Sequence, residues 1–430
     1  MTDSSRRAAF PVAMLLLVAF PAARPAGAGE LWRSEDGESS VSLDTTLKWS
    51  ALVAHNPDDD VLFPERRTAT GLFRLRFGLD AQHGSRINAK LAYEHRARLV
   101  SENAGAGAGS GGVLPDEADV PFRLAQLDWQ IAEKDETFVY RHEFDRALVA
   151  LHPDWGEVTL GRQGVGLGRG VLFSAVDVFA PFTPTEVDRE WRRGVDAARV
   201  ECRVSDTSSA EVISAFGESW DESALLGRFR GYAGSLDGEL LVGKRGEDAM
   251  YALAASSTVG NAEVHMELAL FDLPDPWPED GPFEDEHLVA KALAGASHTF
   301  DVGNGLTLIG EYHYSGFGVE DIDDAAARLA DPEYRERLLR GDTQTLGRHA
   351  VGLSASYPID EALGVGLTIL GSPVDGSGLA SPSVTWNATS SATLVVSAFL
   401  PWGEEPSGGR LESEYGGTPA SLFVHLSLYF

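Results

Sequence analysis

Charged residues recur at every second position in several stretches of this chain. Between residues 68 and 82, for example, Arg74, Arg76 and Asp80 alternate with apolar residues. Side chains two positions apart lie on the same face of a β-strand, so this spacing predicts strands with one charged face and one apolar face. The positions that we expect on the charged faces are Arg74, Arg76, Arg86, Arg96, Arg98, Arg199, Arg203, Arg228, Arg230, Glu263, Glu267, Glu311 and Arg348.

A dry core would not hold such rows, because each unpaired buried charge costs several kcal/mol. The charged faces therefore predict water on one side of the sheet. The opposite faces are uniformly apolar, which favours lipid on the other side. A soluble sheet with one solvated face is the alternative.

A second concentration of charge follows a glycine-rich bend. The residues that we expect in a constriction loop are Arg162, Glu186, Asp188, Arg189, Glu190, Arg192 and Arg193. The bend at 164–168 is not followed by Gly-Lys-Ser/Thr, so a phosphate loop is not indicated. Because the apolar run 171–182 is costly to expose, we expect loop 166–194 to fold inward and narrow a pore. A loop that packs over the mouth is the alternative.

The elements that would position these residues are strands of about ten residues, the length of tilted membrane-crossing strands. The predicted strands are 39–54, 68–82, 85–99, 137–151, 155–165, 195–205, 208–218, 225–235, 238–246, 249–259, 262–272, 286–299, 305–317, 345–357, 361–372, 379–389, 391–402 and 420–430. Short and long connections alternate between them, with the brief link at 247–248 as the exception. We therefore predict an all-β fold: a transmembrane, antiparallel, up-and-down β-barrel with short periplasmic turns and long extracellular loops.

The count of about eighteen strands depends on one segment. Residues 122–132 also alternate, and we assign them to an external loop because an odd number of strands would result; sixteen strands remain an alternative. Helix formers in 318–344 predict a short helix in another loop. The last ten residues, 421–430, alternate up to the terminal Phe, as expected of a strand that closes a barrel.

The N-terminus predicts export. Arg6 and Arg7 precede an apolar run, and Ala26-Gly27-Ala28 offers a small-residue cleavage site, so residues 1–28 read as a secretory signal peptide and 29–430 as one barrel domain. No later stretch approaches the roughly 20 apolar residues of a membrane-spanning helix. The formal net charge of −30 argues against nucleic acid as a partner, and the single Cys202 rules out an internal disulfide and cysteine-based zinc sites.

The acidic loops raise the question of calcium. Residues 272–286 hold many carboxylates and no Lys or Arg, but no loop has the Asp-x-Asp-x-Asp-Gly spacing of a calcium site. Solvation of surface loops is the simpler interpretation. We expect no metal and no cofactor.

The region around the bend resembles a known family. "LGRQ" (160–163), the glycine-rich bend and "DVFAPFTPTEVDREWRRGVDA" (177–197) are similar to the equivalent region of outer-membrane porins of the alginate-export type. The resemblance covers about forty residues. It implies an eighteen-stranded barrel that conducts solutes, in its best-known members an acidic polysaccharide, with Arg162, Arg189, Arg192 and Arg193 as positive loop and lumen positions.

These observations together predict a porin of the bacterial outer membrane that lets small polar or anionic solutes diffuse through an Arg-rich lumen. Its expected surroundings are outer-membrane lipid and lipopolysaccharide. Export of an acidic polysaccharide, a barrel hydrolase using lumen histidines such as His265 and His313, and a plugged adhesin or scaffold are the rival hypotheses. We expect no enzymatic activity, because neither a Gly-x-Ser-x-Gly nor a His-Glu-x-x-His motif is present. No subunit interface is indicated.

Overall fold

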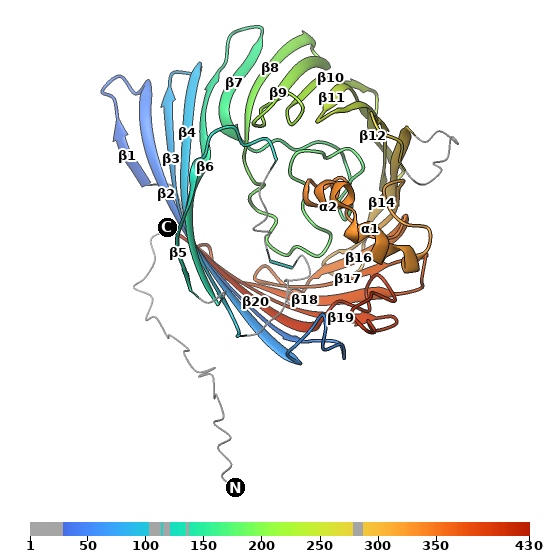
Figure 1. The fold of residues 1–430 in the computed structure, drawn as a ribbon. Coiled ribbons are helices and arrows are strands. Elements are labelled where there is room, and N and C mark those ends of the chain that lie inside the picture. Colours follow the sequence, from blue (N-terminus) through green and yellow to red (C-terminus); the bar gives the residue numbers. More distant parts are fainter. Residues whose placement is uncertain (1–28, 103–112, 115–120, 135–136, 278–286) are drawn as a thin grey trace.

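A closed ring of strands dominates the structure. The computed structural model describes residues 29–102, 113–114, 121–134, 137–277 and 287–430, so the predicted signal peptide lies outside the described residues. Within the described residues, an 18-strand antiparallel barrel closes on itself (Figure 1). β2 and β20 close it, with pairing that runs from Thr46 opposite Tyr429 to His55 opposite Ala420. The predicted barrel of eighteen strands is confirmed, and the alternative of sixteen is wrong.

Each ring strand pairs with its neighbours in chain order. The ring strands are β2 (Ser39–His55), β3 (Arg67–His83), β4 (Ile87–Val100), β6 (Phe138–Leu151), β7 (Gly156–Gln163), β8 (Val195–Ser205), β9 (Ser208–Ala215), β10 (Ala224–Ala233), β11 (Leu236–Arg245), β12 (Asp248–Val259), β13 (Ala262–Asp272), β14 (Leu288–Phe300), β15 (Leu306–Ser315), β16 (His349–Pro358), β17 (Leu363–Gly371), β18 (Gly378–Thr389), β19 (Ala392–Trp402) and β20 (Ala420–Tyr429). Short turns gather at one end of the ring, the short-turn end. Long connections gather at the other, the long-loop end.

Two further strands pair with the ring without joining it. β1 (Gly29–Arg33) pairs with the first residues of β2. β5 (Asp128–Lys134) pairs with β6 from Asp128 opposite Glu143 to Lys134 opposite Phe138, whereas β7 pairs with β6 only from Ala147 to Leu151. β5 thus occupies the part of the β6 edge that β7 does not reach. The alternating segment 122–132 forms a strand only from Asp128 onward, and that strand adds no member to the ring.

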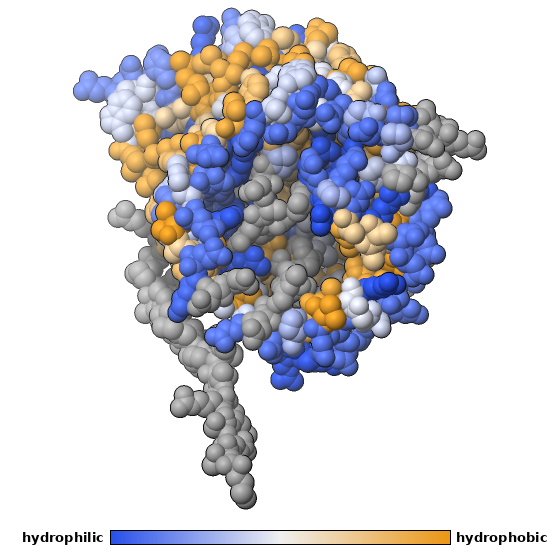
Figure 2. All heavy atoms as spheres, in the orientation of Figure 1, coloured by the Kyte–Doolittle hydropathy of each residue, from blue (hydrophilic) through white to orange (hydrophobic). Residues whose placement is uncertain are grey.

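The two faces of the wall differ as the period of two requires. Outward side chains such as Phe229, Leu240 and Tyr251 are about half exposed, at 46%, 57% and 51%. Hydrophobic residues gather on the outer side of the wall at the top and upper left of Figure 2, and hydrophilic residues gather around the rim. Among the described residues, no helix has the length and apolarity needed to cross a membrane.

The inside of the ring is partly filled by its own connections. Figure 1 shows residues 164–194, here called the inner loop, inside the ring, together with the helical connection between β15 and β16. That connection carries η2 (Ile322–Asp324), α1 (Ala325–Ala330) and α2 (Pro332–Leu339), which confirms the helix predicted in 318–344. Apolar side chains of the inner loop, such as Val178 and Phe179, belong to one buried cluster with inward residues of the wall, such as Ile213 and Phe271.

Candidate functional site

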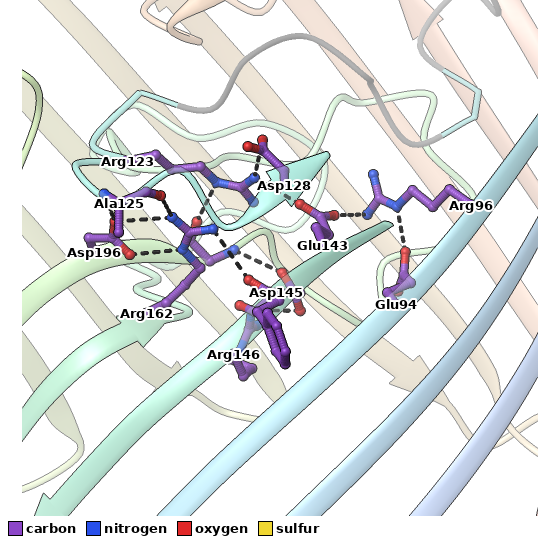
Figure 3. A network of polar contacts seen from close by, with 12 residues as sticks. Glu94, Arg96, Arg123, Ala125, Asp128, Glu143, Asp145, Arg146, Arg162 and Asp196 are labelled. Atoms are coloured by element: carbon purple, nitrogen blue, oxygen red, sulfur yellow. Dashed lines mark hydrogen bonds and ion pairs between the residues drawn. The ribbon is translucent and has the colours of Figure 1, made fainter. Parts of the chain in front are cut away.

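A continuous series of buried ion pairs lies on the inner face of β3, β4 and β6. Arg74 forms a bidentate pair with Glu94 at 2.9 and 3.1 Å. Glu94 also accepts from Arg96, whose other nitrogen lies 3.0 Å from Glu143. Glu143 is shared with Arg123 at 2.8 Å (Figure 3). Positive and negative groups alternate along this series, so each buried guanidinium has a carboxylate partner that offsets its loss of hydration.

A β-bulge in β6 supplies another pair of this network. Ala92 lies opposite Arg146 and Tyr93 lies opposite Phe144, so Asp145 is an extra residue in the ladder. A bulge changes the direction in which neighbouring side chains point. Asp145 lies 2.8 Å from its neighbour Arg146 and 3.0 Å from Arg76. The predicted rows included no residue of 137–151 and so missed Asp145 and Arg146; strict alternation would also assign these two consecutive residues to opposite faces.

Arg162 lies within the wall rather than at a constriction. Its side chain is 0% exposed and forms a bidentate pair with Asp196 at 2.8 and 3.0 Å. It also donates to the carbonyl oxygens of Phe144 and Ala125. Arg162 therefore joins β7, β8, β6 and the segment before β5 (Figure 3). The prediction that it lies at a constriction is wrong, because Arg162 shares the parity of the outward, 51% exposed Leu160 on β7 and is covered by these partners.

The end of the inner loop meets β2 and β3. Lys48 lies 2.7 Å from both Asp188 and Glu190, and Arg74 lies 2.9 Å from Asp188. The Trp191 ring has Lys48 at 3.9 Å and Arg76 at 4.3 Å from its centroid, which are cation–π distances. Sequence reasoning missed Lys48 and Trp191. Lys48 shares the inward parity of its strand with Asp44, but the uncharged Thr46 lies between them, so the strand shows no row of charges.

Two predicted constriction arginines bind the inner loop itself. Arg189 donates to the carbonyl oxygens of Val171, Thr183 and Pro184, and Arg192 pairs with Asp177 of the same loop. These arginines therefore fix the shape of the loop.

Burial changes the acidity of two inner-loop carboxyls. It raises the pKa of Glu186 to about 7, against the opposing effects of a hydrogen bond from the Thr183 backbone and of Arg189. It raises the pKa of Asp177 to about 6, although Arg192 favours the ionised form. Arg74 and Lys48, in contrast, outweigh burial and hold the pKa of Asp188 below its usual value.

A second set of ion pairs lies on the wall across β8 to β11. Arg199 donates to Glu211 at 2.7 Å, and Arg228 bridges Glu211 at 3.3 Å and Glu239 at 2.9 Å. Arg228 is buried at 8% exposure. Most arginines predicted to line the lumen are thus paired with wall carboxylates.

The charges nearest to the short-turn end are more exposed. Arg203 and Glu263 are exposed, Arg230 is 40% exposed beside Glu201, and Arg86 is 72% exposed beside Asp154. These groups are the accessible part of the predicted charged rows.

The remaining predicted positions lie toward the long-loop end. Arg98 follows Arg96 by two positions on β4 and is half buried. Arg348 precedes β16 and pairs with Glu320 of the helical connection, so its predicted place on a strand wall is wrong. Arg193 lines a cavity of about 400 Å³ beside β5, together with Arg96, Arg123, Arg141 and Trp129.

The two histidines considered for catalysis lie on the inner face of the wall, where the inner loop packs against it. His265 Nε2 lies 2.9 Å from Glu311, and His313 is fully buried and stacks on Phe173 at 5.4 Å. Both contacts bring the histidines into the packing beneath the inner loop. Within the described part of the chain, no group of three or more His, Cys, Asp and Glu side chains could hold a metal ion. Much of the acidic segment 272–286 lies outside the described residues.

Comparison with known proteins supports the fold. No protein-family model and no curated protein matches the chain. OccAB1 of Acinetobacter baumannii is similar with a TM-score of 0.56 and 8% identity, covering 95% of this chain and 99% of its own. OccK9 (OpdG) of Pseudomonas aeruginosa has a TM-score of 0.54 and 9% identity, covering 91% and 98%. OccAB4 of A. baumannii has a TM-score of 0.52 and 11% identity, covering 92% and 100%. At such identities the likeness concerns the barrel fold, and these structural neighbours are outer-membrane porins.

Proposed function

We propose that this protein is a porin of the bacterial outer membrane through which small polar or anionic solutes diffuse passively. The observation that carries the proposal is a closed barrel with an apolar outer face and an inward loop held by charged wall residues. An apolar band outside suits lipid, and charges inside suit hydrated solutes. The fold shared with outer-membrane porins supports the same conclusion.

The proposal favours small solutes over a polymer. The inner loop and the helical connection both lie inside the ring (Figure 1), and this reduces the room for an extended polysaccharide chain. The resemblance to alginate-export porins stays a prediction from forty residues. Lipid and lipopolysaccharide contacts, export by a signal peptide and transport without a cofactor belong to the same proposal.

Preference for anions would come from the accessible arginines. Arg203 and Arg230 lie on neighbouring parts of the inner face of β8 and β10, and both retain exposed surface. Glu201 pairs with Arg230 at 3.4 Å, so we expect the preference to be modest.

Planar-bilayer recordings test the proposal. The purified protein should form ion-conducting channels, and the reversal potential in a salt gradient should indicate weak anion preference. Exchanging Arg203 and Arg230 for Glu should shift it toward cations. Arg33→Glu is the control, because Arg33 lies on β1 outside the ring. Absence of channels would refute the porin function, and an unchanged reversal potential would refute the role of the two arginines.

A further inference from the structure

The first half of the inner loop is bound to the wall through its backbone. Every N–H group from Gly168 to Val176 donates to a side chain outside the loop. Most of these donors reach two carboxylates, Glu267 on β13 and Glu311 on β15. We infer that Glu267 and Glu311 are positioning residues. The N–H groups of the inner loop form a nest, a concave set of donors, around their two carboxylates, and this binding holds the loop in place and thereby sets the width of the pore.

Glu267 receives donors from both sides of a turn. One oxygen accepts from the N–H groups of Arg169 and, at 2.7 Å, Gly170. The other accepts from the N–H groups of Ala175 at 2.7 Å and Val176 at 3.1 Å and from the Ser174 hydroxyl at 3.1 Å. Glu267 is 1% exposed. Leaving this buried carboxylate without hydrogen-bond donors would cost free energy, so the loop and the carboxylate stabilise each other.

Glu311 binds the residues between these two groups. One oxygen accepts from Val171 N–H at 2.6 Å, and the other accepts from Leu172 N–H at 2.9 Å and Phe173 N–H at 3.0 Å. The neighbouring N–H groups, of Gly168 and Ser174, donate to Glu239 on the wall and to Gln344 of the helical connection. The segment therefore needs no internal backbone hydrogen bonds to be fixed.

Two glycines make this arrangement sterically possible. A Cβ on Gly168, whose φ is +85°, would lie 2.4 Å from Glu267 Oε1. Gly295 lies between His265 and Glu311 in the strand register, and a Cβ there would lie 2.4 Å from His265 Nε2. Gly168, the last residue of the glycine-rich bend, thus begins a run of N–H groups that bind the protein's own carboxylates rather than a phosphate.

Hydrogen exchange tests the nest without reference to transport. In Glu267→Gln, an amide nitrogen replaces one acceptor, so exchange at 169–170 and 175–176 should become at least about tenfold faster, the factor that corresponds to about 1.4 kcal/mol. Glu263→Gln is the matched control, because Glu263 lies on the same face of β13 and is exposed. Equal exchange in Glu267→Gln and wild type, or equal acceleration in Glu263→Gln, would overturn the inference. If Glu267→Gln does not fold, Glu311→Gln makes the same comparison at 171–173.

Acetate distinguishes a carboxylate nest from general loosening. In Glu267→Ala the loop donors remain and the carboxylate is missing, so acetate should restore slow exchange, whereas it should not change Glu263→Ala. No restoration would overturn the nest.

The effect on the bore rests on the proposed function. Single-channel conductance should rise in Glu267→Gln and should fall back toward the wild-type value when acetate is added to Glu267→Ala. Unchanged conductance with accelerated exchange would refute control of the bore. A wild type that does not conduct would refute the porin function and leave the exchange result to decide the nest.

Discussion

The Lys48 ammonium group on β2 lies 2.7 Å from the Asp188 carboxylate, 140 residues later in the chain. Both side chains are almost fully buried, at 1% and 6% exposure. This pair ties the far end of the inner loop to the strand that closes the barrel. The inner loop is thus bound by its backbone on one side of the ring and by side chains on the other.

Loss of Lys48 should therefore destabilise the protein. In Lys48→Met, Asp188 keeps Arg74 but loses a buried partner, and breaking such a pair costs about 3–5 kcal/mol. Denaturant unfolding in detergent measures the change. Lys90→Met is the control, because Lys90 is 54% exposed beside Asp80 and an exposed pair contributes about 0–1 kcal/mol. Equal losses in the two variants would contradict the buried role of Lys48.

Arg162 should affect stability and not selectivity. In Arg162→Met, buried Asp196 loses its bidentate partner and the β5 segment loses its tie to the wall, with an expected loss of about 3–5 kcal/mol. Replacing both Arg162 and Asp196 with Leu should recover part of it, because no unpaired charge remains. Reversal potentials of the folded variants should match the wild type. A clear shift in reversal potential would return Arg162 to the pore surface.

The inner loop should be held less firmly as the pH rises. Glu186 has a pKa of about 7 in the folded protein, against about 4.3 in an unfolded chain. Between these values the folded state binds a proton that the unfolded state has released, so stability falls with rising pH across this window. Asp177 should act in the same sense up to its pKa of about 6.

Melting temperatures of Glu186→Gln and wild type measure this dependence. Between about pH 5 and pH 8, the melting temperature of the variant should rise relative to that of the wild type, because the variant has no carboxyl at this position to ionise. Using the difference between the two proteins cancels the titration of other groups. A difference that does not change with pH would show that Glu186 ionises as an exposed carboxyl.

The sequence predicted the ring well because a strand's period of two is a local property. All eighteen strands, including 420–430, follow from alternation and from the sorting of connections by length. The degree to which each inward side chain is buried could not be predicted from alternation. Glu263 and Glu267 have the same inward parity on β13, yet Glu263 is exposed and Glu267 is 1% exposed, because the inner loop covers only Glu267.

The candidate site was harder to predict for the same physical reason. Parity places Glu267 and Glu311 inside the ring but does not show that backbone N–H groups from residues far away in the chain will surround them. The bulge at Asp145 also breaks the simple pattern, and Lys48 follows the pattern without forming a row. Partners that meet only in the closed ring leave no trace in local spacing.

The central claim, an aqueous interior within an apolar exterior, is tested most directly by thiol labelling at two adjacent residues of β16. Ser354 has the inward parity of Gly352, which approaches the inner loop, whereas Leu353 is outward and 49% exposed. In a Cys202→Ser background, reconstituted Ser354→Cys should react with a charged, membrane-impermeant thiosulfonate and its conductance should fall. Leu353→Cys should stay unlabelled. Labelling of Leu353→Cys with no reaction at Ser354→Cys would contradict the account.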